Sequence, residues 1–594
     1  MITFPSPDIE EFYRYASVMA FSIHEKAGRA ALITNLSGSY EVWEMGLQTH
    51  YPVMISHADK TLRTIDYDPN GRYLVIAADD AGDETTQIYL MPARGGQLQP
   101  LVVHPGFRHH VLHVSEDGNR LYYASNHENV QFYNNYVRDL TTDEETLLLA
   151  GQEVPTLIIQ VSPEETSWIA LKSYANTHMS AWFGGSGSLA SLVPDPMKAH
   201  VVYGAVFVSD QEVWFATNYD AEHAYLARYD SQTQRMERML EIPGEDIVEI
   251  QYDRKHRQIL LLTDCGVDQR FYKVSVDHPV AVEVSIPVTV VTQMAATRSG
   301  LWYLAGQSET SPTNLYCFCD GRWEPVTENR SLAISPSNAT RAEVVHYASF
   351  DGLEIEALWF APQVRNGYTI VWPHGGPQAM ERRQFRPIFQ YLATLGYQIF
   401  APNFRGSTGY GLQFTQMVEG DWGDGPRRDV LAGMDWLVQT GRMDPSRVFV
   451  VGGSYGGYMA LLLHGRHPER FQAVVDIFGP SDLRTFVQSV PDTWKPMMKR
   501  WLGDPDIDQA RFIADSPITY VERMTRPMLV VQGANDPRVV KAESDQMVAA
   551  LRDRGRTIEY LVLEDEGHGF AKKENEIRAY RAIADFLENQ RKTH

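Results

Sequence analysis

The segment FVVGGSYGGYMA, residues 449–460, places Ser454 between two pairs of glycines. Residues 447–451 have the apolar pattern of a buried strand, and residues 458–463 continue as an apolar helix. A serine on a tight turn between a strand and a helix is held with its oxygen exposed at the carboxyl end of a parallel sheet. An ordinary turn that contains a serine by chance is the simpler alternative. The flanking elements favour the first interpretation, so we predict that Ser454 is a nucleophile.

A serine hydroxyl is a poor nucleophile at neutral pH and needs a base, which is itself oriented by a carboxylate. Asp536 follows the apolar run 528–532, and His568 follows the apolar run 560–563. Taken singly, Asp536 could be a loop residue or helix cap, and His568 a surface histidine. Their order after Ser454 and their positions beyond strand ends match the order serine, acid, histidine of α/β-hydrolases. We therefore predict a catalytic triad of Ser454, Asp536 and His568.

The negative oxygen that forms during attack by serine needs two fixed hydrogen-bond donors. The backbone N–H of Tyr455 is one candidate, because it lies at the start of the expected helix, where amides are unpaired. The second donor is expected in the turn WPHGGP, residues 372–377. Gly375 or Gly376 could present an N–H there without a side chain in the way, and we favour Gly376.

These residues need a parallel sheet to hold them, and the sequence from about residue 340 onward has that pattern. Apolar strands alternate with amphipathic helices, which is typical of a mostly parallel α/β sheet. We expect strands at residues 343–349, 354–360, 369–372, 398–401, 448–451, 473–477, 528–532 and 559–563. Residues 340–594 are therefore predicted to form an α/β-hydrolase domain, which begins after the loop-like segment 335–339.

The preceding half of the chain is a series of short β runs that repeats. Seven similar segments start near residues 22, 67, 114, 161, 208, 252 and 296. A period of about 45 residues is the size of one four-stranded propeller blade. A solenoid of strands is the competing architecture. We predict an all-β seven-bladed propeller over residues 15–335 and a short N-terminal segment, residues 1–14, that packs on the hydrolase domain.

Several motifs of the C-terminal half occur together in one known family. They are HGGP, NFRGSTGYG (403–411), DWGD (421–424), GGSYGGYM, NDPRV (535–539) and GHGF (567–570). In these motifs the domain resembles the prolyl oligopeptidase family of serine peptidases, and HGGP combined with GGSYGGY is most similar to the acylaminoacyl-peptidase branch. The resemblance implies the same triad and the same role for the Tyr455 amide.

The resemblance also implies substrate-binding residues. Arg538 would hold a backbone carbonyl of the substrate, Val539 would form part of the primary specificity pocket, and Phe478 would line that pocket. An ordinary surface ion pair is the alternative for Arg538. Val540 stands where many relatives have proline, and the propeller half has no evident paired-glutamate helix to bind a free amino terminus. These differences argue against a dipeptidyl peptidase.

Composition excludes other classes of function. The net charge of −22 is unsuited to binding nucleic acid, which needs clustered Lys and Arg. Three cysteines are too few for a disulfide framework and favour a cytoplasmic protein. The acidic N-terminus does not resemble a secretory signal, and no apolar stretch reaches membrane-spanning length. We expect no membrane association, no metal and no cofactor.

The sequence therefore predicts a serine peptidase that hydrolyses short peptides, with N-acylated peptides as candidate substrates. An esterase or small-amide hydrolase on the same scaffold is the first alternative, because its catalytic groups would be identical. A non-catalytic propeller binding protein is the second, and the complete set of catalytic residues argues against it. A homo-oligomer is compatible with the sequence.

Overall fold

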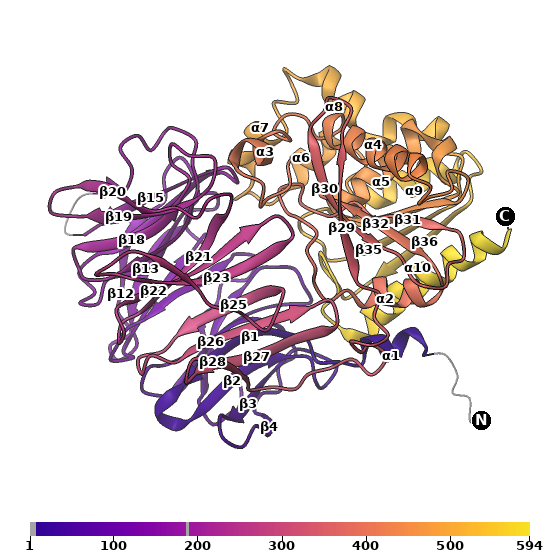
Figure 1. Ribbon diagram of the computed structural model, residues 1–594. Coiled ribbons are helices and arrows are strands. Elements are labelled where there is room, and N and C mark those ends of the chain that lie inside the picture. The colour runs from indigo at the N-terminus through magenta and orange to yellow at the C-terminus, as the bar shows by residue number, and fades with distance from the viewer. Residues whose placement is uncertain (1–6, 186–188, 594) are drawn as a thin grey trace.

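The computed structural model describes residues 7–185 and 189–593. An all-β domain and an α/β domain lie side by side in it (Figure 1). The N-terminal segment enters as helix α1 (Ile9–Tyr13), which packs beside α2 and α10 of the α/β domain. Residues 1–6 of the segment predicted to pack there lie outside the described residues.

The described part of the first domain contains seven four-stranded antiparallel sheets, so the predicted seven-bladed propeller is confirmed. Each blade is built from four consecutive strands, in order from the first to the last. The strands are β1 to β4 (Val18–His24, Arg29–Thr34, Glu41–Gly46, Pro52–Met54), β5 to β8 (Thr61–Tyr67, Tyr73–Asp79, Gln87–Pro92, Gln99–Val102), β9 to β12 (His109–Val114, Arg120–Ser125, Asn134–Asp139, Glu145–Ala150), β13 to β16 (Thr156–Val161, Trp168–Ala175, His178–Gly184, Leu189–Ser191), β17 to β20 (Val202–Phe207, Glu212–Thr217, Tyr225–Asp230, Arg235–Leu240), β21 to β24 (Asp246–Asp253, Gln258–Cys265, Asp268–Ser275, Ala281–Glu283) and β25 to β28 (Val290–Ala296, Trp302–Ser308, Ser311–Cys319, Arg322–Pro325).

The repeated sequence segments correspond to the turn after the first strand of each blade and to the second strand that follows it. In blade 2 this turn contains Gly71, which has φ +68° and donates its N–H to the carbonyl of Asp68 at 2.7 Å. The second strand, β6, is almost entirely buried, because both of its faces pack against neighbouring blades. This explains why the second strand of each repeat is the most apolar part of the sequence.

The α/β domain contains one eight-stranded sheet in the order β29, β30, β32, β31, β33, β34, β35, β36. Strands β29 and β30 are antiparallel to their neighbours, and the pairs from β32 to β36 are parallel, so the predicted α/β-hydrolase fold is confirmed. The strands are β29 (Ala342–Ala348), β30 (Glu354–Phe360), β31 (Thr369–Val371), β32 (Gln398–Pro402), β33 (Val448–Gly453), β34 (Ala473–Ile477), β35 (Met528–Gly533) and β36 (Ile558–Leu563).

Helices cover both faces of this sheet (Figure 1). Buried residues of α4, α5 and α9 form a core on one face, and those of α1, α2 and α10 form a core on the other. The α-helices are α2 (Pro387–Thr394), α3 (Leu412–Gln416), α4 (Gly425–Gln439), α5 (Tyr455–Arg466), α6 (Leu483–Ser489), α7 (Lys495–Trp501), α8 (Gln509–Asp515), α9 (Lys541–Arg552) and α10 (Lys573–Thr593). This two-sided burial explains why the parallel strands are continuous apolar runs in the sequence.

The end of propeller strand β22 contacts a loop of the hydrolase domain. Arg382 binds the carboxylate of Asp264 through two nitrogen atoms, each at 2.7 Å. The side chains of this pair are largely buried, at 18% and 4% exposed. A two-point bond between an arginine and a carboxylate fixes orientation as well as distance. The two domains are therefore held in a defined relation next to the ends of the parallel strands.

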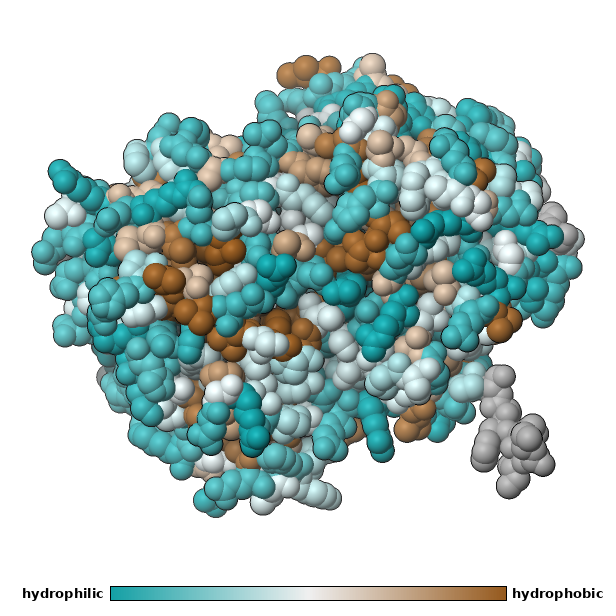
Figure 2. Space-filling model, viewed as in Figure 1, coloured by the Kyte–Doolittle hydropathy of each residue, from teal (hydrophilic) through white to brown (hydrophobic). Residues whose placement is uncertain are grey.

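The surface shown in Figure 2 is mainly hydrophilic, with hydrophobic residues in separate groups over both domains. Within the described ranges, no helix combines the length and the apolar character needed to cross a bilayer.

Candidate active site

Ser454 lies between strand β33 and helix α5 in a strained backbone conformation, with φ 57° and ψ −122°. Such a conformation costs on the order of 1–3 kcal/mol in a residue other than glycine and persists only where the surroundings enforce it. A side chain on Gly452 would overlap the carbonyl of Gly456, and one on Gly456 would overlap the carbonyl of Pro373. The glycines are therefore needed because the turn is packed closely on its neighbours.

His568 and Asp536 lie in line with this serine. His568 Nε2 is 2.9 Å from Ser454 Oγ, and His568 Nδ1 is 2.6 Å from Asp536 Oδ2. The Asp536 side chain is fully buried and that of His568 is 8% exposed. Because a carboxylate accepts hydrogen bonds, Asp536 favours the tautomer in which Nδ1 carries the proton and Nε2 is free to accept the serine proton.

The carboxylate of Asp536 is held by the backbone that follows it. The N–H groups of Arg538 and Val539 both donate to Asp536 Oδ1 at 2.9 Å. These bonds leave Oδ2 directed to His568. The motif NDPRV thus orients the acid and also positions the two predicted substrate-binding residues next to it.

The two predicted oxyanion donors lie beside the serine. Tyr455 is the first residue of α5, where backbone N–H groups have no partner within the helix. Gly376 lines the same cavity as Ser454 and Tyr455 and has φ +125°. A Cβ on Gly375 would lie 3.3 Å from the Gly453 carbonyl oxygen and 3.4 Å from the Ser454 Cβ.

His374 holds the glycine turn in place, a role that the sequence did not indicate. Its Nδ1 is 2.7 Å from the Gly375 carbonyl and its Nε2 is 2.9 Å from Ser407 Oγ, and its ring stacks on Phe404. Burial lowers the pKa of His374 to about 4, so the ring is neutral at physiological pH. The motifs HGGP and NFRGS therefore act together, because the second supports the first.

A cavity of about 110 Å³ opens at Ser454. Its lining residues include Arg538 and Val539, as the resemblance implied, together with Gly376, Trp422, Ser454, Tyr455, Pro480, Phe486, Trp494, Trp501 and His568. The three tryptophans were missed in the sequence analysis. Trp422 belongs to the motif DWGD, but Trp494 and Trp501 lie in a segment whose sequence has no recognisable signal.

Phe478 does not line this cavity, although we predicted it there. Its ring centroid is 4.6 Å from that of His568, and it also contacts Phe570. Its backbone has φ +44°. The side chain therefore packs against the His568 ring.

Arg538 forms an ion pair with the propeller. Its Nε lies 2.7 Å from Glu84 Oε1, and its side chain remains 44% exposed. The alternative prediction, that Arg538 forms an ion pair, is thus met. The pair is not an ordinary surface pair, because it joins the two domains at the edge of the cavity. An exposed guanidinium in this position is also available to a substrate.

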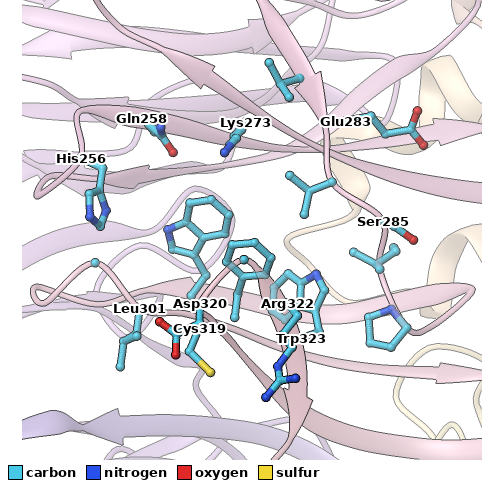
Figure 3. Close-up of a pocket in the computed structure, with 18 of the residues that line it drawn as sticks. His256, Gln258, Lys273, Glu283, Ser285, Leu301, Cys319, Asp320, Arg322 and Trp323 are labelled. Carbon is cyan, nitrogen blue, oxygen red and sulfur yellow. The ribbon is translucent and has the colours of Figure 1, made fainter.

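A larger cavity, of about 900 Å³, lies between the last two blades and is lined by propeller residues (Figure 3). Gln258 and Lys273 lie on one side of it and Arg322 and Trp323 on the other. Desolvation raises the pKa of the nearby Cys319 thiol, so this potential nucleophile is protonated. We therefore assign no catalytic role to this cavity. Among the residues the structure describes, no cluster of histidine, cysteine and acidic side chains is arranged to hold a metal.

Asp476 lies beneath the serine turn, at the end of β34. It is fully buried, Oδ1 accepts the Gly479 N–H at 2.8 Å, and Oδ2 has no partner. Burial raises its pKa to about 8, so its carboxyl group is protonated at neutral pH.

Asp476→Asn should therefore change how stability depends on pH. The folded pKa of about 8 lies above the unfolded value of about 3.9, so the wild type loses stability as pH rises between these values. The loss is at most about 1.4 kcal/mol per pH unit, and the asparagine variant lacks it. We expect the melting temperature of the variant to exceed that of the wild type by more at pH 8.5 than at pH 5. If the melting temperatures of the two proteins changed with pH in parallel, Asp476 would not be a buried neutral acid.

Comparison with known proteins agrees with this geometry. Residues 383–594 match the prolyl oligopeptidase family. Over 225 residues the chain is 40% identical to dipeptidyl peptidase family member 6 of Caenorhabditis elegans, which covers 37% of this chain and 30% of that protein. Over 223 residues it is 29% identical to the acylamino-acid-releasing enzyme of Arabidopsis thaliana, covering 36% and 28%. The matches thus span less than a third of the length of these relatives.

The whole chain also has the fold of solved peptidase structures. A puromycin-hydrolyzing peptidase of Mycobacterium tuberculosis superposes with a TM-score of 0.86, covering 99% of this chain and 97% of that one, at 18% identity. At that identity the likeness concerns the fold alone. Within this fold, the match to the prolyl oligopeptidase family is a match of the C-terminal domain, over residues 383–594.

Proposed function

We propose that this chain is a serine peptidase that hydrolyses short peptides through an acyl-enzyme on Ser454. The observation that carries the proposal is the hydrogen-bonded series from Asp536 through His568 to Ser454 Oγ, with distances of 2.6 and 2.9 Å. Nucleophile, base and orienting acid are each within hydrogen-bond reach of the next.

In the proposed reaction, His568 Nε2 takes the Ser454 proton while Oγ attacks the carbonyl carbon of the substrate. The N–H groups of Tyr455 and Gly376 donate to the oxygen that becomes negative. His568 then gives its proton to the leaving amine as the C–N bond breaks, and an ester to Ser454 remains. Water, deprotonated by the same histidine, attacks this ester and releases the acid and the free serine.

The lining of the cavity favours substrates with an apolar residue before the scissile bond. Trp422, Trp494 and Trp501 provide apolar walls, and Val539 completes them. Arg538 would then bind a backbone carbonyl further from the scissile bond, since a guanidinium offers several donors. Small activated esters need no such contact, so we favour peptides over esters as substrates.

The charges near Ser454 favour substrates whose amino terminus is blocked by an acyl group. Three carboxylates line the described cavities that Arg538 also lines, namely those of Asp79, Glu84 and Glu566. Asp79 binds Arg63, Glu84 binds two arginines, and Glu566 accepts backbone and side-chain N–H groups. A substrate ammonium group would therefore meet bound carboxylates and arginines of its own charge. An N-acyl group would meet no such repulsion.

We expect an N-acetyl dipeptide anilide to be cleaved at least about tenfold more efficiently than the same compound with a free amine, because one unfavourable charge contact is worth about 1.4 kcal/mol or more. The measurement is kcat/KM for the matched pair over a range of salt concentrations, since salt screens the repulsion. A preference for the free amine would make removal of dipeptides the better description.

Removal of dipeptides is the second candidate because the relative with 40% identity is named a dipeptidyl peptidase, whereas the acylamino-acid-releasing enzyme is 29% identical. The anilide pair distinguishes the two activities. The free cysteines Cys265, Cys317 and Cys319 support a reducing compartment such as the cytoplasm. A homo-oligomer, the lack of a cofactor and the lack of nucleic-acid binding remain predictions from the sequence.

A further inference from the structure

The turn between β6 and β7 of propeller blade 2, residues 80–86, touches both loops that carry the triad acid and base. Gly82 packs on Gly567, the residue before His568, so closely that a Cβ on Gly82 would lie 2.7 Å from the Gly567 nitrogen. Asn535, the residue before Asp536, donates its side-chain N–H to the Ala81 carbonyl at 3.4 Å. Propeller backbone thus supports the two loops at the residues next to the triad.

The same turn also holds the predicted substrate-binding arginine. Glu84 accepts from Arg538 Nε at 2.7 Å through one oxygen and from Arg108 at 3.2 Å through the other. The Glu84 and Arg108 side chains are only 17% and 16% exposed. A guanidinium is planar, so a bond at Nε fixes the plane and leaves the two terminal nitrogens for another acceptor.

The backbone of this turn has an uncommon shape. Ala81, Gly82 and Glu84 have φ values of 51°, 81° and 58°, in the left-handed region. The Gly82 N–H binds Asp79 Oδ1 at 3.1 Å, and Asp79 is held in turn by Arg63. Residues such as Ala81 and Glu84 keep this conformation only where their contacts enforce it, and such sites cluster where function requires them.

We propose that the turn of residues 80–86 is a positioning element of the catalytic site, in which Glu84 orients Arg538 toward the substrate and Gly82 supports the loop of His568. This inference rests on the proposed function. The hydrolase domain thus carries the triad and Arg538, while the propeller helps to position His568 and Arg538.

The first test is Glu84→Gln, measured with a peptide anilide and with a small activated ester of the same acyl residue. A hydrogen bond between charged groups is worth enough for about a tenfold effect. We expect KM for the peptide to rise about tenfold, and the ratio of peptide to ester kcat/KM to fall by the same factor. Glu84→Gln combined with Arg538→Ala should lose little more than Arg538→Ala alone, because both remove one interaction.

Glu116→Gln is the matched control. Glu116 lies in the β9–β10 turn and pairs with Arg254 and Arg298 of other blades. Successive turns of a blade lie at opposite ends of its strands, so this turn faces away from the hydrolase domain. The control should keep wild-type kinetics on both substrates. Independent, additive losses from the Glu84 and Arg538 changes would overturn the role of Glu84.

The second test is Gly82→Ala, which places a methyl group against Gly567. Displacement of His568 should lower kcat on the peptide and the ester alike and slow labelling of Ser454 by a fluorophosphonate, with little change in KM. If a melting curve shows that the variant is folded and its rates equal those of the wild type, then Gly82 does not support the loop of His568. If the wild type neither labels nor hydrolyses either substrate, the proposed function itself fails, and this inference fails with it.

Discussion

Ser454→Ala is expected to lower kcat for peptide hydrolysis by roughly 10⁴-fold or more, because removing the nucleophile disables a triad that acts as a unit. The residue that replaces serine must still adopt φ 57° between packed glycines, so alanine, the smallest change, is the right choice. The measurement is single-turnover and steady-state hydrolysis of an N-acetyl peptide anilide.

The control is a melting curve, which should stay close to that of the wild type, since among the described residues the hydrogen bond of Ser454 Oγ is the one with His568 Nε2. A fluorophosphonate should label the wild type and not the variant. A folded variant that keeps a tenth of its activity would eliminate Ser454 as the nucleophile.

Asp536→Asn is expected to lower kcat by about 10⁴-fold, nearly as much as loss of the serine. Asparagine keeps the shape of the side chain, but its amide can donate to His568 Nδ1 and so favours the tautomer with the proton on Nε2. That tautomer cannot accept the serine proton. Steady-state kinetics on the same anilide measure the loss.

The variant also tests whether the acid acts through the histidine. Binding of a substrate-like inhibitor should be nearly unchanged, since Asp536 is fully buried and does not meet the substrate. A large rise in KM with unchanged kcat would instead indicate that Asp536 supports the backbone of Arg538 and Val539.

Much of the fold could be predicted because it rests on local patterns. The repeated turn and buried second strand recur in all seven blades, and the continuous apolar runs follow from a parallel sheet covered on both faces. Ser454, Asp536 and His568 were predicted because each lies a few residues beyond the end of a strand at most, and the structure brings them within hydrogen-bond distance.

What the sequence did not indicate depends on contacts between distant segments. Glu84 meets Arg538 across 454 positions, and no pattern around Glu84 distinguishes it from other turn residues. Trp494 and Trp501 reach the cavity from α7 and the residue before it, an irregular region after β34. Phe478 lies outside the lining of this cavity, with its ring against His568 and its backbone in the left-handed region.

The connection between the domains has a mechanical consequence. The chain crosses from one domain to the other twice, after α1 and after β28, and the crossings are tied together where Asn329 binds both the N–H and the carbonyl of Ala16. Both crossings therefore lie at one edge, beside the first and last blades (Figure 1). We therefore expect this edge to act as a hinge between the domains.

Blade 4 lies opposite this hinge in the ring of seven, and rotation moves that edge the furthest. The contacts there and in blade 5 are polar, from Thr177 to Glu419 and from the Leu412 N–H to the Glu222 carbonyl at 3.0 Å. Water can replace such bonds at small net cost. We expect substrates to enter through an opening between the domains at this edge. The extent to which the propeller rotates about its hinge would then determine which peptides reach Ser454.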